Sequence, residues 1–234
     1  GSGINAHKQF AKLFAQEITK LTKNKYKFTP AKNFYHELSA QDCSVQLSGE
    51  LKNLAVILMK ISNDLRWMNS GPLAGISEIE LKALQPGSSI MPGKVNPVIP
   101  EAVAMASADV IGNDVSITVA AQSGNFQLNV MLPVIAYNLL KSINLLSGSM
   151  NALSKNAIKT FKVNHKNLET SLSKNPILVT ALNPLVGYEK AASIAKKAYK
   201  ENRPIIDVAA EETDLAKSEL IKLLNPSKLA KGGL

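Results

Sequence analysis

A run of apolar residues between positions 47 and 68 repeats with alternating spacings of four and three. Its members are Leu47, Leu51, Leu54, Leu58, Ile61, Leu65 and Met68. This heptad pattern places every member on one stripe of a long helix. We predict a helix over about residues 41–69, which would be ~43 Å long at about 1.5 Å per residue. A helix cannot cover such a stripe itself, so it requires long partner helices from the same chain or from other copies.

Three more segments have helical patterns. Residues 4–23 carry apolar side chains at steps of three and four, which predicts an amphipathic helix. Pro97 and Pro100 suit the first turn of a helix that we expect to run to about residue 121. Another helix is predicted from about 128 to 158. Residues 24–40 read as a connection, and residues 71–96 as a long irregular stretch.

From about residue 162 the predicted segments become short, because turn signals such as Asn175-Pro176 and Asn183-Pro184 recur. We expect four or five short helices there. Aromatic residues make up only 5% of the chain, and Leu, Ala and Lys are frequent, which favours helices. The predicted fold class is all-α: a long-helix bundle over residues 1–162, followed by a small helical C-terminal domain over residues 163–234.

Charge and composition restrict the possible partners. The net charge is +9, but the lysines are spread along the chain, so a solvated cationic surface is favoured over a nucleic-acid site. The apolar stretches are short and interrupted, so no membrane span is expected. Nor does the N-terminus have the apolar core of a signal peptide. Cys43 is the single cysteine; it suits a reducing compartment, and we expect its thiol to be buried. His7, His36 and His165 have no partners at metal-ligand spacing, so no metal site is predicted.

Residues 87–97 read GSSIMPGKVNP, a composition that fits neither a helix nor a strand. Such a loop can exist simply because the chain must turn. However, it ends the irregular stretch of residues 71–96, and irregular stretches longer than about 12–15 residues in compact domains are usually functional or disordered. Ser88 and Ser89 offer hydroxyl groups, Lys94 a positive charge and Asn96 an amide, next to a helix N-terminus. Together these groups could hold a carboxylate or a phosphate.

The same residues resemble the GSSxMPxKxNP signature of the fumarase/aspartase superfamily. Flanking stretches agree, among them NDLRWMNSGP at 63–72 and EAVAMASADVIGND at 101–114. Within the superfamily the chain most resembles the class II fumarases, because Gly93 stands where aspartases typically have alanine. The resemblance implies reversible hydration of fumarate to L-malate in the tricarboxylic acid cycle, with no cofactor. It also implies homotetramers whose active sites are shared between subunits, in the cytoplasm or, in a eukaryote, the mitochondrion.

The resemblance also implies roles for individual residues. Ser88 matches the catalytic base, and Glu101 a glutamate that orients a catalytic histidine. Substrate-contacting positions correspond to Ser89, Lys94, Val95 through its backbone, and Asn96. Leu73 departs from the family, where many relatives have arginine. None of the three histidines matches the family's acid-side histidine, so we expect them at the surface or behind the site.

The matched region is the second half of the family pattern, so the chain is expected to be inactive alone. Two alternatives stay open at this stage. One is an aspartate ammonia-lyase of the same superfamily, and the other is a non-catalytic helical protein that serves only assembly. A malate dehydration assay set against an aspartate deamination assay separates the two enzymes.

Overall fold

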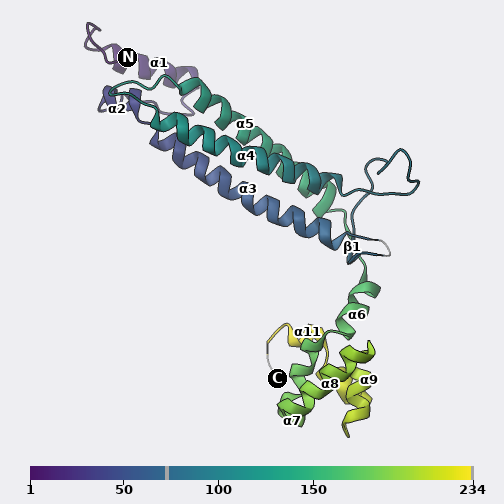
Figure 1. The fold of residues 1–234 in the computed structure, drawn as a ribbon. Coiled ribbons are helices and arrows are strands. Elements are labelled where there is room, and N and C mark those ends of the chain that lie inside the picture. Colours follow the sequence, from purple (N-terminus) through teal and green to yellow (C-terminus); the bar gives the residue numbers. More distant parts are fainter. Residues whose placement is uncertain (72–73, 233–234) are drawn as a thin grey trace. The chain divides into compact units, whose positions relative to one another are not determined.

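The structure is a computed structural model that describes residues 1–71 and 74–232, and it confirms the all-α prediction (Figure 1). Its first helices are α1 (Phe10–Leu21), α2 (Phe34–Ser39), α3 (Asp42–Met68), α4 (Val98–Gln122) and α5 (Leu132–Leu153), followed by the π-helical turn η1 (Ser154–Ile158). The later ones are α6 (His165–Ser173), η2 (Pro176–Leu182), α7 (Asn183–Val186), α8 (Tyr188–Glu201), α9 (Ile205–Glu212), α10 (Lys217–Leu223) and α11 (Pro226–Leu229). Two short strands, β1 (Ile79–Glu80) and β2 (Lys162–Val163), complete the described elements.

The chain divides into two compact units. The first consists of residues 1–66 and 81–161, and the second of residues 67–80 and 162–234. Residues 67–80, which the sequence assigned to the bundle, thus join the C-terminal segment. The link is the antiparallel pairing of β1 with β2, in which Ile79 faces Val163 and Glu80 faces Lys162.

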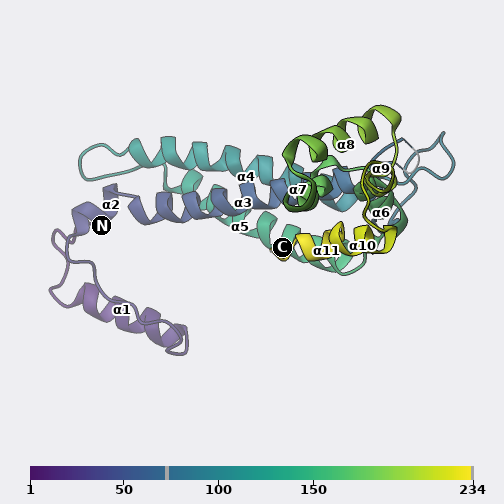
Figure 2. The ribbon, with the colours of Figure 1, turned by 90° about the horizontal axis from the view of Figure 1, so that it is seen from below.

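In the first unit, α3, α4 and α5 run side by side, and each is antiparallel to the next (Figures 1 and 2). The predicted helices over 41–69, 97–121 and 128–158 are confirmed by α3, by α4, and by α5 with η1. Polar contacts join α4 to α5: Lys141 pairs with Asp109 at 2.8 Å, and the Asn113 amide donates to the Ser142 hydroxyl at 3.1 Å. Two long antiparallel helices of this kind are the partners that the heptad stripe of α3 requires.

The buried face of α3 is rotated slightly from the predicted heptad stripe. Leu58 and Leu65 are buried, but Leu47 is 45% exposed. Between the leucines, the buried positions are taken by the small residues Ser48, Ala55 and Ser62, each one position after a predicted seam residue. The covered face of α3 is therefore centred on these small residues, and part of the apolar stripe lies at its edge.

A buried carboxylate joins α3 to α4. Asp114 of α4 accepts a hydrogen bond from the Ser48 hydroxyl at 2.7 Å, and the Lys52 ammonium lies 2.6 Å from its other oxygen. Burial would raise the pKa of Asp114. The hydrogen bonds from Lys52 and Ser48 and the charge of Lys52 outweigh that effect, so its pKa lies below the ordinary value. These two contacts hold α3 and α4 together at one point along their length.

Several local predictions need correction. The first helix begins at Phe10 rather than at residue 4, because Gly3 and Asn5 adopt positive φ angles of 82° and 59°, which no right-handed helix accommodates. The predicted connection at 24–40 contains α2, whose start is capped by the Asn33 side chain. Cys43 is exposed rather than buried, because it lies on the outer face of the first turn of α3.

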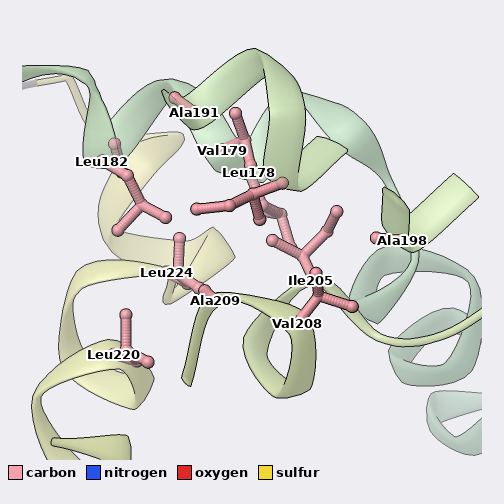
Figure 3. Close-up of a cluster of buried hydrophobic side chains, with 12 residues drawn as sticks. Leu178, Val179, Leu182, Ala191, Ala198, Ile205, Val208, Ala209, Leu220 and Leu224 are labelled. Carbon is pink, nitrogen blue, oxygen red and sulfur yellow. The ribbon is translucent and has the colours of Figure 1, made fainter. Parts of the chain in front are cut away.

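The second unit has its own core, which Figure 3 shows in close-up. Its buried apolar side chains come from η2, α8, α9 and α10, and include Leu182, Ile194, Ile205, Val208 and Leu220. On its surface, Glu212 pairs with Lys190 and Lys197, and Arg203 pairs with Glu201 and Glu211. These short helices agree with the predicted small helical segment, although they are more numerous than the four or five expected.

By length and composition alone, α4 is apolar enough to cross a membrane, contrary to the sequence-based expectation. Within the first unit it instead packs along α5 and carries Asp109 and Asp114, each paired with a lysine from a neighbouring helix. We therefore interpret α4 as the core helix of the bundle.

Candidate active site

The candidate site is the loop of residues 87–97, which precedes α4 in the first unit (Figure 1). Gly87, Ser88 and Asn96, near its two ends, are half-buried, whereas residues 89–95 are exposed. Two hydrogen bonds join the ends. The Gly87 N–H donates to the Lys94 carbonyl at 3.0 Å, and the Asn96 side-chain amide donates to the Gly87 carbonyl at 2.8 Å. The loop is therefore a closed excursion of the chain and not an open connection.

Inside the loop, the Ser88 hydroxyl oxygen accepts two backbone hydrogen bonds. The N–H groups of Ile90 and Met91 both lie 3.2 Å from it. Two fixed donors that point at one oxygen favour negative charge on that oxygen. An ordinary serine hydroxyl is a very weak base. These two donors make Ser88 a better candidate than an ordinary serine for accepting a proton.

Three of the other four predicted loop residues face solvent. Ser89, Lys94 and Val95 are exposed. Across residues 1–71 and 74–232, no carboxylate lies within ion-pair distance of the Lys94 ammonium, so its charge is available to an anion. Asn96 uses one amide hydrogen for the Gly87 carbonyl, which leaves the second hydrogen for another acceptor.

Glu101 lies in the first turn of α4, directly after the loop, and its N–H donates to the Pro97 carbonyl at 3.1 Å. The histidine that this glutamate would orient is not supplied here. His7, His36 and His165 are all exposed, and in the described part of the chain none is hydrogen-bonded to Glu101 or to the loop. The structure thus gathers Ser88, Lys94 and Asn96 on one loop, with Glu101 at its C-terminal foot and no partner acid.

Sequence reasoning missed the backbone groups of this site. The donors to Ser88 belong to Ile90 and Met91, whose side chains gave no signal, and the two hydrogen-bond partners of Gly87 could not be named from the sequence. A serine that bonds the N–H groups two and three residues ahead is a recognised turn pattern, so SSIM carried a usable hint. Leu73, the departure from the family, lies outside the described residues.

Two other features do not contribute to this site. A cavity of about 280 Å³ lies in the second unit and is lined mainly by apolar residues such as Leu172, Leu178 and Ile221, with none of the predicted site residues. Within the described ranges, no three side chains of His, Cys, Asp or Glu lie close enough together to hold a metal ion.

Comparisons with known proteins agree with this arrangement. A family model described as Lyase matches residues 1–112, and one described as Fumarase C C-terminus matches residues 178–231. Fumarate hydratase class II 2 of Pseudomonas aeruginosa is 62% identical over the whole chain, which covers 51% of that protein. Fumarate hydratase class II of Bacillus subtilis is 45% identical, over 99% of this chain and 50% of its own length. The chain spans about half the length of the curated relatives it matches.

Solved structures give the same result. The class II fumarase of Schistosoma mansoni superposes with a TM-score of 0.86 at 33% identity, covering 98% of this chain and 51% of that one. A fumarate lyase:delta crystallin of Brucella melitensis, solved bound to cobalt, reaches a TM-score of 0.90 at 40% identity, over 98% of this chain and 49% of its own. A helical bundle that carries a serine loop of this sequence is typical of the fumarase/aspartase superfamily. Within that superfamily, the chain belongs to the class II fumarase family and corresponds to its C-terminal half.

Proposed function

We propose that this chain supplies the serine loop of a fumarate hydratase active site, which interconverts fumarate and L-malate. The observation that carries the proposal is Ser88, whose hydroxyl oxygen accepts hydrogen bonds from the Ile90 and Met91 N–H groups. The names of the relatives support the same reaction.

In the direction of malate dehydration, Ser88 acts as the base in its alkoxide form. It takes a proton from the carbon next to one carboxylate, and the electron pair left behind becomes the carbon–carbon double bond. The hydroxyl group on the neighbouring carbon leaves as water after an acid on the opposite face protonates it. The two N–H donors stabilise the alkoxide before the transfer. Positioned proton transfer of this kind contributes about 10²–10⁴-fold to the rate.

Substrate binding is assigned to the exposed part of the loop and to Asn96 at its half-buried end. Fumarate and malate are dianions, and the carboxylate beside the deprotonated carbon gains further charge during the reaction. Lys94 offers an unpaired ammonium, Ser89 a hydroxyl, Val95 its backbone and Asn96 its second amide hydrogen. Glu101 is proposed to orient the opposing acid, which must come from residues outside this chain or from another copy.

Association into a homotetramer with shared sites is part of the proposal. Its support is the apolar surface that one copy leaves uncovered on α3 and α4, where Val56, Ile57, Met105, Val115 and Val119 are each about half exposed or more. Long helices with such surfaces are stabilised when further helices cover them. A cytoplasmic location, or a mitochondrial one in a eukaryote, stays a prediction from the resemblance.

The test is a chimera in which the N-terminal half of the Pseudomonas aeruginosa relative precedes this chain. We expect it to hydrate fumarate, and Ser88→Ala to lower kcat by at least about 10²-fold with unchanged assembly. Ser227→Ala, which removes an exposed hydroxyl in α11, is the matched control and should keep full activity.

Each alternative has its own outcome. Deamination of aspartate without hydration of fumarate would assign the chain to an ammonia-lyase. An assembled chimera without either activity would leave a non-catalytic assembly role. Full hydration activity in Ser88→Ala would remove Ser88 as the base.

A further inference from the structure

The base of the serine loop is closed by contacts that converge on the main chain of one residue, Gly87. Its N–H donates to the Lys94 carbonyl at 3.0 Å, and its carbonyl accepts from the Asn96 side chain at 2.8 Å. Both main-chain polar groups of this residue are therefore held by residues seven and nine positions further along. We call Gly87, the Lys94 carbonyl and the Asn96 amide the neck of the loop.

The neck has no room for a side chain at Gly87. A Cβ atom built there would lie 2.3 Å from the Lys94 carbonyl oxygen and 2.6 Å from the Lys94 carbonyl carbon. These are main-chain atoms, which cannot rotate away as the end of a long side chain can. Any larger residue at this position must push apart the two chain segments that meet at the neck. Glycine is required here by close approach of the backbone.

The neck adjoins the catalytic hydroxyl. Ser88 directly follows Gly87, and its oxygen is held by N–H groups within the same closed segment. Lys94, whose carbonyl forms part of the neck, carries the ammonium assigned to the substrate. A shift of the neck therefore moves the base and the cation together, although neither neck contact involves a reacting atom.

We infer that Gly87 and Asn96 are positioning residues. They hold the serine loop closed and so direct Ser88 and Lys94 toward the same substrate molecule. This inference deepens the proposed function and rests on it for the catalytic part alone. Closure of the loop is a property of the chain itself. Asn96 then has two tasks, because one amide hydrogen holds the loop and the other remains for the substrate.

The first test measures the neck without any activity. The Lys94–Val95 bond is a trypsin site in the exposed part of the loop. On the 234-residue chain, we expect Gly87→Ala and the nearly isosteric Asn96→Asp to raise the rate of cleavage at this bond at least about tenfold, since an opened loop enters the protease more readily. Gly148→Ala is the control: it adds the same methyl group in α5, where nothing lies within 4 Å, and should leave the rate unchanged.

The second test uses the active chimera. We expect Gly87→Ala to lower kcat for fumarate hydration by at least about tenfold and to shift the pH profile of kcat/KM, because the donors to Ser88 move. Gly148→Ala should change neither quantity. Unchanged cleavage at Lys94–Val95 in both neck variants would refute the claim that the neck contacts hold the loop closed. Raised cleavage with wild-type kcat and pH profile would overturn the positioning role. A chimera inactive on fumarate would refute the proposed function, while the cleavage rates still decide the neck.

Discussion

Lys52→Met should destabilise the folded chain by about 1–2 kcal/mol, because it leaves the buried Asp114 carboxylate without its ionic partner. The side chain of Asp114 is only 8% exposed, and the Lys52 ammonium lies 2.6 Å from it. Removing one partner of a fully buried pair typically costs about 3–5 kcal/mol. Lys52 is 46% exposed and Ser48 still donates to the carboxylate, so solvent screening and the remaining bond reduce the expected cost.

The assay is urea unfolding at a fixed protein concentration, followed by circular dichroism. Lys60→Met is the matched control, since it makes the same change on the same helix in the exposed pair of Lys60 with Asp64. Exposed pairs of this spacing contribute only about 0.3–0.5 kcal/mol. Asp114→Asn, alone and combined with Lys52→Met, completes a double-mutant cycle, which isolates the coupling between the two side chains.

The effect should also depend on pH. The pKa of Asp114 is lowered in the folded chain, so its contribution is fully present above the unfolded value of about 3.9 and is lost as the pH falls through the folded value. The difference between wild type and Lys52→Met should therefore be complete at pH 7 and shrink below about pH 4. A cost no larger than that of Lys60→Met, or one that does not change with pH, would refute the reasoning.

Three further predictions concern binding, association and activity. In the active chimera, Lys94→Met should weaken inhibition by a dicarboxylate analogue as well as lower kcat, since it removes a charge that faces a dianion; an unchanged inhibition constant would mean that Lys94 points elsewhere. Ile57→Asp should lower the mass measured by light scattering and preserve the helical signal, because Ile57 is 48% exposed, whereas its neighbour Leu58→Asp should unfold the chain, because Leu58 is 6% exposed. Equal behaviour of these two variants would contradict the assignment of the inner and outer faces of α3. The 234-residue chain alone should show no fumarate hydration, and a rate above about 10⁻³ of a typical kcat of about 10 s⁻¹ would show that the missing acid is not needed.

Much of the fold could be predicted because its signals are local. The helices α3, α4 and α5 follow from apolar spacings and from proline and glycine at their ends, which act within a few residues. The serine loop was recognisable for the same reason, since its glycines, prolines and serines exclude regular structure over one continuous stretch. Where local signals were weak the prediction erred, as at α2, whose start depends on the single cap Asn33.

The sequence by itself determined the fold class, the long helices and the residues that can carry the chemistry, because each depends on side chains close together along the chain. Only the tertiary structure decided which side of α3 faces inward, since the burial of Ser48, Ala55 and Ser62 depends on segments that are distant in sequence. It also decided the pairing of residues 79–80 with 162–163, which joins segments that are distant in sequence. The same holds for the loop: GSSIMPGKVNP supplies the serine, but the donors to Ser88 and the closure at Gly87 exist only once the backbone has folded back on itself, because they are main-chain groups that no side-chain pattern records.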